Sequence, residues 1–451
     1  MSEAERAISA AWWIVDDLVR FGMEHACVSP GSRSTPIALA LARHPSVSLH
    51  VHLDERASGF FALGVSKATG RPVAVATTSG TAASELFPAV VEASMSRATL
   101  VLLTADRPPE LRGVGANQAI DQVGLFGSYV RASLDAPVPG DGPDEEGWHE
   151  LIVELTKASM GLPPGPIHLN LPFREPLVGA DAELPAAPPS GTGHTPSADP
   201  SPEEVEALER ELASTAHGLI VGGPAREAPP TLPELARAIA WPMLAEPTSW
   251  LRVPGTLSAG QFLLGDGPFA NTHVPDVVVQ FGAAPTSRAG LELVRRAGKL
   301  VIVDQDHLVA DPHRKAAITI RAEAAAFVPE LQESLRPREE GTWFRDWTEA
   351  DTVARSAVDR VIDGWDEPFE GRIARDVAAS MPEGSALVVG SSMPVRDLDA
   401  YMRPRDGLRV LANRGASGID GFVSTALGVA ATGVTTAALC GDLTLLHDVG
   451  S

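Results

Sequence analysis

Short apolar runs alternate with longer amphipathic stretches along the first third of the chain. Each run is rich in branched residues and is bounded by Gly, Pro or polar residues, which is typical of buried strands. The stretches between them, such as Glu55–Thr69 and Ala82–Met95, have helical spacing, as does the N-terminal MSEAERAISAAWWIVDDLV. The runs are HACVS (25–29), VSLHVHL (47–53), PVAVATT (72–78), ATLVLLT (98–104) and PIHLNL (166–171).

This alternation predicts an α/β fold in which helices cover both faces of a parallel sheet. Ligands of such sheets bind beyond the carboxyl ends of the strands. The polar and small residues of the first third gather at those predicted ends. They form SPGSRSTP (29–36), LDE (53–55), TTSGT (77–81) and TADRP (104–108).

The pattern recurs in two further blocks. A Pro-, Gly- and Ser-rich stretch predicts a linker at 186–203 after a first domain at 1–185. A second block, 204–338, contains HGLIVGG, WPMLAEP, DVVVQFG and KLVIVD, and predicts another Rossmann-like unit. The third block, 339–451, holds only three predicted strands, in ALVVGSS, LRVLANR and TTAALCGD, so we expect a C-terminally truncated domain.

Composition narrows the classes of function. The formal net charge of −22 argues against nucleic-acid binding, which needs a basic face. No apolar run reaches the roughly 18 residues of a membrane span, and the acidic N-terminus lacks a signal-peptide n-region, so we expect a cytoplasmic protein without a transmembrane segment. Cys27 and Cys440 have no metal or disulfide spacing and are expected to be small buried apolar residues.

Several basic residues of this acidic chain fall inside its most distinctive loops. Arginines in such places suggest recognition of carboxylate or phosphate, and surface ion pairing is the alternative. The loop arginines are Arg33, Arg107, Arg288, Arg396 and Arg414.

Two carboxylates have positions that suggest chemistry. Glu55 follows a strand and opens an apolar helix, where it could cap the helix or handle a proton. Asp442, after Gly441 at the end of a predicted strand, could hold Mg²⁺ beside phosphates or simply form a turn. The small residues of TTSGTAA and NRGASGIDG would let a planar ligand approach the backbone.

Taken together, these motifs resemble thiamine-diphosphate enzymes, and most closely the 2-succinyl-5-enolpyruvyl-6-hydroxy-3-cyclohexene-1-carboxylate synthases of menaquinone biosynthesis, the MenD family. The resemblance runs from about residue 8 to the chain end, and the central block matches mainly in pattern. The motifs that carry it are SPGSRSTP, DERASGFFALG, TTSGTAA, TADRPPELRGVGANQAIDQ, SSMPVRD, NRGASGIDG and GDLTLLHD.

The resemblance implies three doubly wound Rossmann-like domains: a pyrimidine-binding domain, a central domain and a diphosphate-binding domain that is incomplete here. It implies a homodimer or a dimer of dimers, with active sites formed between subunits. Glu55 matches the catalytic glutamate that contacts the aminopyrimidine ring of thiamine diphosphate. Asp442 matches a ligand of Mg²⁺ (or Mn²⁺). Further cofactor-binding residues are implied at Thr78, Gly80, Ser391, Met393, Gly418, Ile419 and Gly441, and substrate-binding residues at Ser32, Arg33, Arg107, Gln118, Arg288, Ser392, Arg396 and Arg414.

The implied reaction is decarboxylation of 2-oxoglutarate and Stetter-like 1,4-addition of the succinyl-semialdehyde carbanion to isochorismate. Both substrates are dicarboxylates, which suits the arginines. The chain departs from the family pattern at its end, because Ser451 follows Asp442 closely and the family's second metal-binding side chain is absent, so we expect weak or no activity of this form. A thiamine-diphosphate decarboxylase of acetohydroxyacid-synthase type, or a non-catalytic scaffold derived from an enzyme, are the alternatives.

Overall fold

The chain folds around three parallel β-sheets, which confirms the predicted α/β class. The structure, a computed structural model, describes residues 1–178, 199–224, 229–265, 267–305 and 311–450. Residues 186–198 of the predicted linker lie outside that set, and the predicted domain boundaries stay predictions. The chain forms two compact units: unit 1 comprises Met1–Pro196, Asn413–Val434 and Asp442–Ser451, and unit 2 comprises Ser197–Ala412 and Thr435–Gly441.

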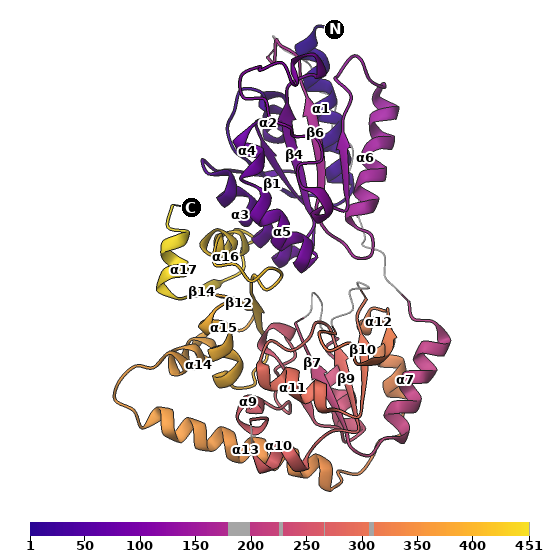
Figure 1. Ribbon diagram of the computed structural model, residues 1–451, viewed down its shortest axis with the longest axis vertical. Helices are drawn as coiled ribbons and strands as arrows, with labels where there is room; N and C mark the ends of the chain where they lie inside the picture. The colour runs from indigo at the N-terminus through magenta and orange to yellow at the C-terminus, as the bar shows by residue number, and fades with distance from the viewer. Residues whose placement is uncertain (179–198, 225–228, 266, 306–310, 451) are drawn as a thin grey trace. The chain divides into compact units, whose positions relative to one another are not determined.

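Unit 1 is organised by a six-stranded parallel sheet in the order β2-β1-β3-β4-β6-β5 (Figure 1). The strands predicted in the first third are all present. Strand β5, at one edge, was not predicted. The strands are β1 (His25–Val28), β2 (Ser48–Val51), β3 (Val73–Thr77), β4 (Leu100–Asp106), β5 (Ala132–Asp135) and β6 (Ile167–Pro172).

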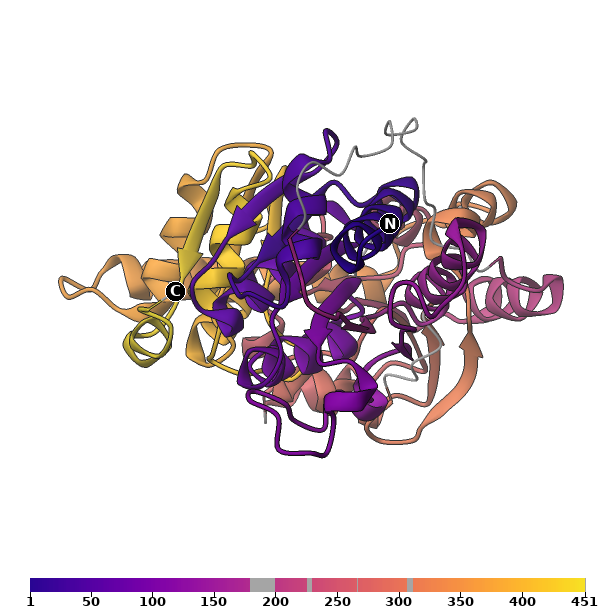
Figure 2. The ribbon, with the colours of Figure 1, turned by 90° about the horizontal axis from the view of Figure 1, so that it is seen from above.

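Helices cover both faces of this sheet, because alternate strand residues point to opposite sides. On one face, α1 (Glu3–Arg20), α2 (Thr35–Arg43) and α6 (Glu145–Ser159) share a core with strand residues such as Val101 and Leu103. On the other face, α3 (Glu55–Thr69) and α5 (Phe87–Ser96) pack on Leu100 and Leu102. Figure 2 shows α1 and α6 together in one layer.

Local sequence signals set the ends of these helices. Helix α1 begins with a capping box, in which the Ser2 and Glu5 side chains each accept a hydrogen bond from the other residue's backbone N–H. Helix α3 has the predicted bounds and ends at Gly70, whose φ of +70° favours glycine. The stretch predicted as one helix at 82–95 is two, α4 (Thr81–Ser84) and α5, because Pro88 occupies the first turn of a new helix.

Two late helices, α16 (Phe422–Ala430) and α17 (Asp442–His447), belong to unit 1. Helix α16 packs closely on α3, since a Cβ on Gly64 would lie 2.0 Å from the Thr425 carbonyl oxygen, so only glycine fits there. Asp448, fully buried, accepts hydrogen bonds from the Ser424 N–H (2.9 Å) and from Arg56 (3.2 Å). Helix α3, which carries Glu55, therefore packs on the sheet and is also held by α16 and Asp448.

Unit 2 contains a five-stranded parallel sheet in the order β11-β10-β9-β7-β8. The predicted strands of the second block are present, and the edge strand β11 was not predicted. Helices α7, α8 and α12 pack on one face, and α10, α11 and α13 on the other. The bounds are β7 (Gly218–Gly222), β8 (Met243–Ala245), β9 (Val277–Phe281), β10 (Lys299–Val303), β11 (Ala316–Ile320), α7 (Pro202–Ser214), α8 (Leu232–Ala238), α9 (Gly260–Leu263), α10 (Pro268–Thr272), α11 (Arg288–Arg296), α12 (Ala324–Ser334) and α13 (Thr342–Asp363).

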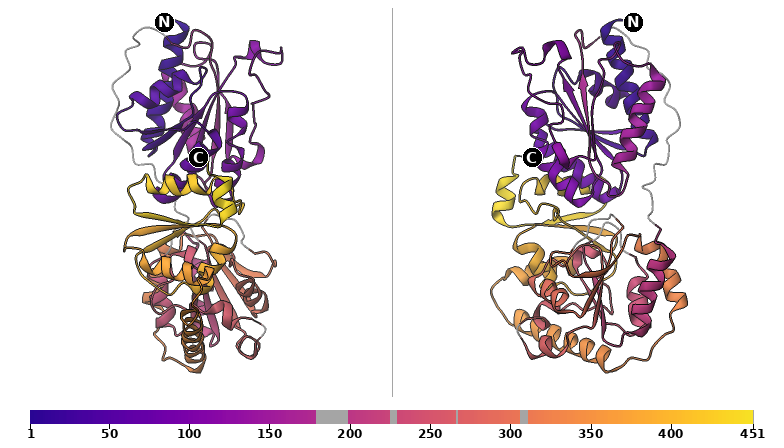
Figure 3. Two further views of the ribbon diagram at one scale, coloured as in Figure 1. Left: turned by 90° about the vertical axis from the view of Figure 1, so that its left-hand side faces the viewer. Right: turned by 45° about the vertical axis from the view of Figure 1, so that its right-hand side comes forward.

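A three-stranded parallel sheet, β13-β12-β14, completes unit 2 and matches the three strands predicted in the last block (Figure 3). Helices α14 (Glu370–Ser380) and α15 (Met393–Tyr401) form a core with it. Of the helices described, none is both long and apolar enough to cross a membrane. The strands are β12 (Ser385–Val389), β13 (Leu408–Leu411) and β14 (Thr436–Leu439).

Candidate active site

Three loops meet at the carboxyl end of the sheet in unit 1, as the strand pattern predicted. Arg107, directly after β4, donates a hydrogen bond from its guanidinium to the Ser79 hydroxyl, which in turn donates to the Gln118 carbonyl oxygen at 3.0 Å. The Gln118 side-chain amide donates to the Ser79 carbonyl oxygen at 2.9 Å. Gln118 has a φ of +59°, a conformation that such contacts must hold in place. Two predicted substrate-binding residues, Arg107 and Gln118, are thereby brought together.

Arg33 approaches the same edge from the loop after β1. Its side chain is mostly buried and donates to the Phe173 carbonyl oxygen (2.8 Å) and to the Glu175 carboxylate (2.9 Å). Burial, and then the positive charge of Arg33, lower the pKa of Arg107. The ion pair that the sequence left as an alternative is therefore present for Arg33. Two guanidinium groups nevertheless share one edge of the sheet, which favours an anion there.

Glycines permit the close approach of these loops. A Cβ on Gly31 would lie 2.4 Å from the Cβ of Thr78, so the loops after β1 and β3 touch at that point. Gly80 has a φ of +84°, and a Cβ there would lie 3.0 Å from the Gln118 Cγ. The small residues of these motifs thus allow the loops to pack on one another. Ser32, by contrast, is exposed.

Glu55 opens α3 at the carboxyl end of the edge strand β2. The cap of this helix is Asp54, whose Oδ1 accepts a hydrogen bond from the Ala57 N–H at 2.9 Å. Glu55 is half-buried, and within the described residues its carboxylate has no hydrogen-bond partner. The structural alternative for Glu55, a helix cap, is therefore wrong, and the proton-handling alternative remains.

A buried polar network lies beneath the loops. Gln122 accepts a hydrogen bond from the Gly80 N–H (3.2 Å) and donates to Asn170 Oδ1 (2.7 Å). Asn170 donates to Asp106 (3.0 Å), and Asp106 accepts from the Arg107 N–H (2.7 Å). The contacts fix the ends of β3, β4 and β6 relative to one another. A fully satisfied network of this kind makes the site rigid.

The sequence reasoning missed this network, although a signal was present. His168 and Asn170 alternate in the strand PIHLNL and so point to the same side of the sheet. His168 is fully buried and bonds through Nε2 to Thr104 Oγ1 at 2.7 Å. Two polar side chains at alternate positions of an otherwise apolar strand indicate a partner network in the core.

We expect His168 to make the free energy of unfolding decrease as the pH is lowered. Burial lowers the pKa of His168 to about 4, from an ordinary value near 6.5, so the folded state holds this ring neutral. The contribution of neutral His168 to the free energy of unfolding is therefore complete above about pH 6.5. It declines by about 1.4 kcal/mol per pH unit as the pH falls towards 4. Urea unfolding of the His168→Gln variant at several pH values should show a shallower decline than wild type.

The control for that measurement is His217→Gln, because His217 has a half-exposed side chain on an ion pair with Asp276. This variant retains His168, so its decline between about pH 6.5 and 4 should be steeper than that of His168→Gln. Burial also lowers the pKa values of His25, His50 and His52, so part of the decline will persist in the His168 variant. Equal slopes for wild type and His168→Gln would contradict the expected role.

Four predicted site residues after β13, namely Arg414, Gly418, Ile419 and Asp442, belong to unit 1. Arg414, Gly418 and Ile419 are half-buried in the loop that precedes α16. Asp442 is the first residue of α17, is exposed, and accepts a hydrogen bond from the Leu443 N–H at 2.8 Å. The described residues contain no cluster of three His, Cys, Asp or Glu side chains that could hold a metal ion by themselves.

The remaining predicted residues belong to unit 2. Ser391 is buried before α15, whereas Ser392 and Arg396 are exposed and Met393 is 52% exposed. Arg396 donates to the Met393 sulfur at 3.7 Å. Gly441 follows β14. Cys440, expected to be buried, is only half-buried, because β14 is an edge strand of its sheet; Cys27, on an inner strand, is buried as expected.

Buried ion pairing in unit 2 fixes α15 and the PTSR turn. Arg252, on the loop after β8, bonds to the Asp399 carboxylate of α15 at 2.7 Å. Glu246 accepts a hydrogen bond from the Thr286 N–H, and burial together with the charge of Asp399 raises its pKa to about 8. Arg288 opens α11 two residues after Thr286 and is exposed. Arg288 and Arg396 thus extend from anchored elements.

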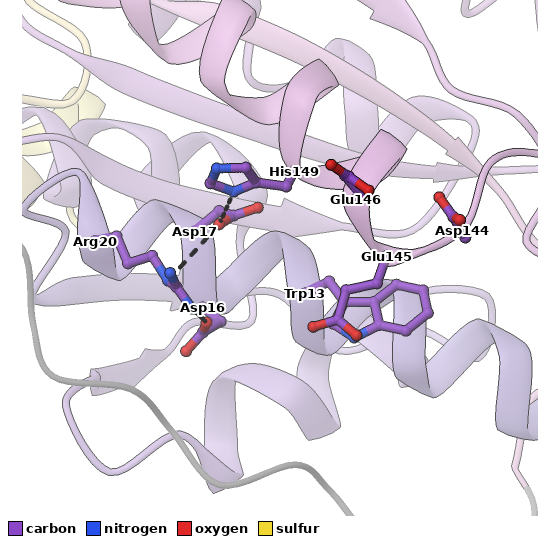
Figure 4. A pocket seen from close by; sticks show the side chains of 8 residues that line it. All are labelled: Trp13, Asp16, Asp17, Arg20, Asp144, Glu145, Glu146 and His149. Carbon is purple, nitrogen blue, oxygen red and sulfur yellow. Dashed lines mark hydrogen bonds and ion pairs between the residues drawn. The ribbon is translucent and has the colours of Figure 1, made fainter.

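A cavity of about 460 Å³ in unit 1 lies apart from all of these residues, between α1 and the start of α6 (Figure 4). Its walls are acidic, and His149 bonds to Asp17 there at 2.7 Å. Such walls repel organic acids, so this cavity does not fit the dicarboxylates that the sequence leads us to expect as substrates. It is lined by Trp13, Asp16, Asp17, Arg20, Asp144, Glu145, Glu146 and His149.

Comparison with known proteins agrees with this arrangement. Residues 8–125, which include Glu55, Arg107 and Gln118, match the family described as thiamine pyrophosphate enzyme, N-terminal TPP binding domain. The fold and the match define an enzyme of the thiamine-diphosphate class.

Curated relatives specify the family. The 2-succinyl-5-enolpyruvyl-6-hydroxy-3-cyclohexene-1-carboxylate synthase of Thermobifida fusca is 44% identical over 96% of this chain and 79% of its own length. The enzymes of the same name from Geobacillus kaustophilus (41%) and Myxococcus xanthus (39%) match 100% of this chain and 80% of their own lengths. The chain belongs to this family, the MenD family of thiamine-diphosphate enzymes.

Proposed function

We propose that the protein joins a four-carbon unit from 2-oxoglutarate to isochorismate, with loss of CO2, the reaction that the resemblance of its motifs to the family implies. The product is 2-succinyl-5-enolpyruvyl-6-hydroxy-3-cyclohexene-1-carboxylate. The observation that carries the proposal is the meeting of Arg33, Arg107 and Gln118 at one sheet edge, beside the loop of Ser79 and Gly80. Both substrates are dicarboxylates, and guanidinium groups bind carboxylates through paired, charge-assisted hydrogen bonds.

The residues present fit thiamine diphosphate in two respects. Glu55 is half-buried at a helix N-terminus and is not used as a cap. The loops at Thr78 and Gly80 pack tightly through glycine, so the backbone there is held rigidly for a ligand. When bound, thiamine diphosphate supplies the carbanion chemistry that lets C2 of 2-oxoglutarate lose CO2 and form a new carbon–carbon bond.

The proposed role of Glu55 is to exchange a proton with the aminopyrimidine ring of the cofactor. Ser391, Met393, Gly418 and Ile419 are proposed to line the cofactor. Gly441 and Asp442 are proposed to hold its diphosphate with Mg²⁺ or Mn²⁺, for which an exposed carboxylate after a strand is a suitable oxygen ligand.

The remaining residues are proposed to bind substrate. In the resting fold Arg33 is ion-paired with an exposed carboxylate, that of Glu175, whose side chain is 72% exposed. A substrate carboxylate could therefore exchange with it at small desolvation cost. The other proposed substrate-binding residues are Ser32, Arg107, Gln118, Arg288, Ser392, Arg396 and Arg414. We further propose the homodimer or dimer of dimers and the cytoplasmic location expected from the sequence.

The test of this function is turnover of paired substrates with thiamine diphosphate and Mg²⁺. Product formation followed by mass spectrometry should require both 2-oxoglutarate and isochorismate. Consumption of pyruvate in the absence of isochorismate would instead support a decarboxylase of acetohydroxyacid-synthase type. No Mg²⁺-linked binding of thiamine diphosphate, together with no turnover, would support a scaffold.

A further inference from the structure

The loop 413–421 is held by a buried carboxylate from a distant part of the chain. Glu92 lies on α5, is 2% exposed, and belongs to the same unit as the loop. Its Oε1 accepts a hydrogen bond from the Gly415 N–H at 3.0 Å, and its Oε2 from the Ala416 N–H at 2.6 Å. One side chain therefore binds the two consecutive amides that follow Arg414.

A lysine completes the contact on the other side of Arg414. Lys67 of α3 donates to Glu92 Oε1 at 2.9 Å and to Asn413 Oδ1 at 3.1 Å. The Asn413 amide donates to the Thr425 hydroxyl of α16 at 3.0 Å. The residues immediately before and after Arg414 are thus both tied to buried side chains.

Packing leaves this loop little freedom to move. A Cβ on Gly415 would lie 2.8 Å from the Glu92 carbonyl oxygen and 2.8 Å from the Met95 Cβ. The side chains of Glu92 and Lys67 are only 3% and 10% exposed, so both charges have lost most of their contact with water. Their ion pair and their hydrogen bonds compensate for that loss. Such a cluster serves as a fixed support for the residue that it flanks.

We propose that Glu92 is a positioning residue for Arg414, and that Lys67 assists it. This inference rests on the proposed function, in which Arg414 binds a substrate carboxylate. Glu92 touches neither the substrate nor the cofactor. It fixes the backbone at residues 415 and 416, so that the backbone that carries Arg414 does not have to be ordered when substrate binds.

The first test needs no substrate. In Glu92→Gln, the neutral side chain retains one good acceptor and loses the charge-assisted contacts, so the amides of Gly415 and Ala416 should exchange hydrogen for deuterium about tenfold faster than in wild type. The matched control is Glu154→Gln, the same substitution at a side chain that is 77% exposed and pairs only with Lys157 among the described residues. Unchanged exchange in Glu92→Gln would overturn the inference.

The second test is a double-mutant cycle with Arg414→Ala. Glu92→Gln should raise KM for one substrate about tenfold with little change in kcat, and should add little when Arg414 is already alanine. Additive effects would overturn the inference, since Glu92 would then act independently of Arg414. No effect of Arg414→Ala would overturn both its substrate role and this inference, while the exchange data would still report whether the loop is held. If Glu92→Gln does not fold, the double variant Lys67→Met/Glu92→Gln removes both buried charges and serves the same tests.

Discussion

Replacing Glu55 with glutamine should lower kcat by about 100- to 10,000-fold, the range for loss of a general acid–base group. The amide is nearly isosteric with the carboxylate but cannot exchange a proton. The fold should be unchanged, because the helix is capped by Asp54 and Glu55 makes no hydrogen bond within the described residues. Steady-state kinetics and thermal unfolding of the same preparation measure the two effects.

The control for Glu55 is its neighbour. Asp54→Asn keeps a good N-cap, because asparagine and aspartate cap helices about equally well. It should leave kcat and the unfolding temperature close to wild type. A Glu55→Gln enzyme with wild-type kcat, or one that is merely unfolded, would refute the assigned role.

Replacing Arg107 with alanine should raise KM for at least one substrate by about 10- to 150-fold, since a lost charge-assisted contact costs about 1.5–3 kcal/mol. The Arg107 guanidinium also holds Ser79, which is tied to Gln118, so the truncation disturbs two proposed substrate contacts at once. Each KM is measured with the other substrate saturating. Ser79→Ala removes only the internal anchor and should have the smaller effect.

Arg43 provides a matched control for Arg107. It is an exposed arginine in the last turn of α2, away from the site loops, and its alanine variant should have wild-type kinetics. Arg107→Lys keeps the charge but lacks the forked donors, so its KM should lie between those of wild type and alanine. If Arg107→Ala behaved like Arg43→Ala, the substrate role of Arg107 would be wrong.

The pattern of apolar residues was sufficient for the inner strands, for α3 and for the edge strands β2, β8, β13 and β14, but it missed two other edge strands. Strands β5 (ASLD) and β11 (AAITI) are partly exposed edge strands, and alanine, serine or threonine fill positions where a buried strand has bulky apolar residues. Pro88 marks the start of a new helix and so separates α4 from α5. The helical spacing of apolar residues alone does not show this break.

The site divides in the same way. The loops at the strand ends were predictable, because parallel topology places them at one edge. The contacts within and between these loops were not predictable. The sequence around Gln122 or Glu92 does not show which distant backbone amides these side chains will bind. Both are polar residues buried by tertiary packing. Gln122 binds Gly80, 42 residues away in the sequence, and Glu92 binds Gly415, 323 residues away.

The most direct measurement of the central claim is the release of labelled CO2 from 2-oxoglutarate carrying the label in its C1 carboxylate. Release and product formation are followed in one reaction with thiamine diphosphate, Mg²⁺ and isochorismate. The proposed function predicts equal amounts of CO2 and product, and little release when isochorismate is omitted. Rapid release without isochorismate, or product formation without release of the label, would contradict it.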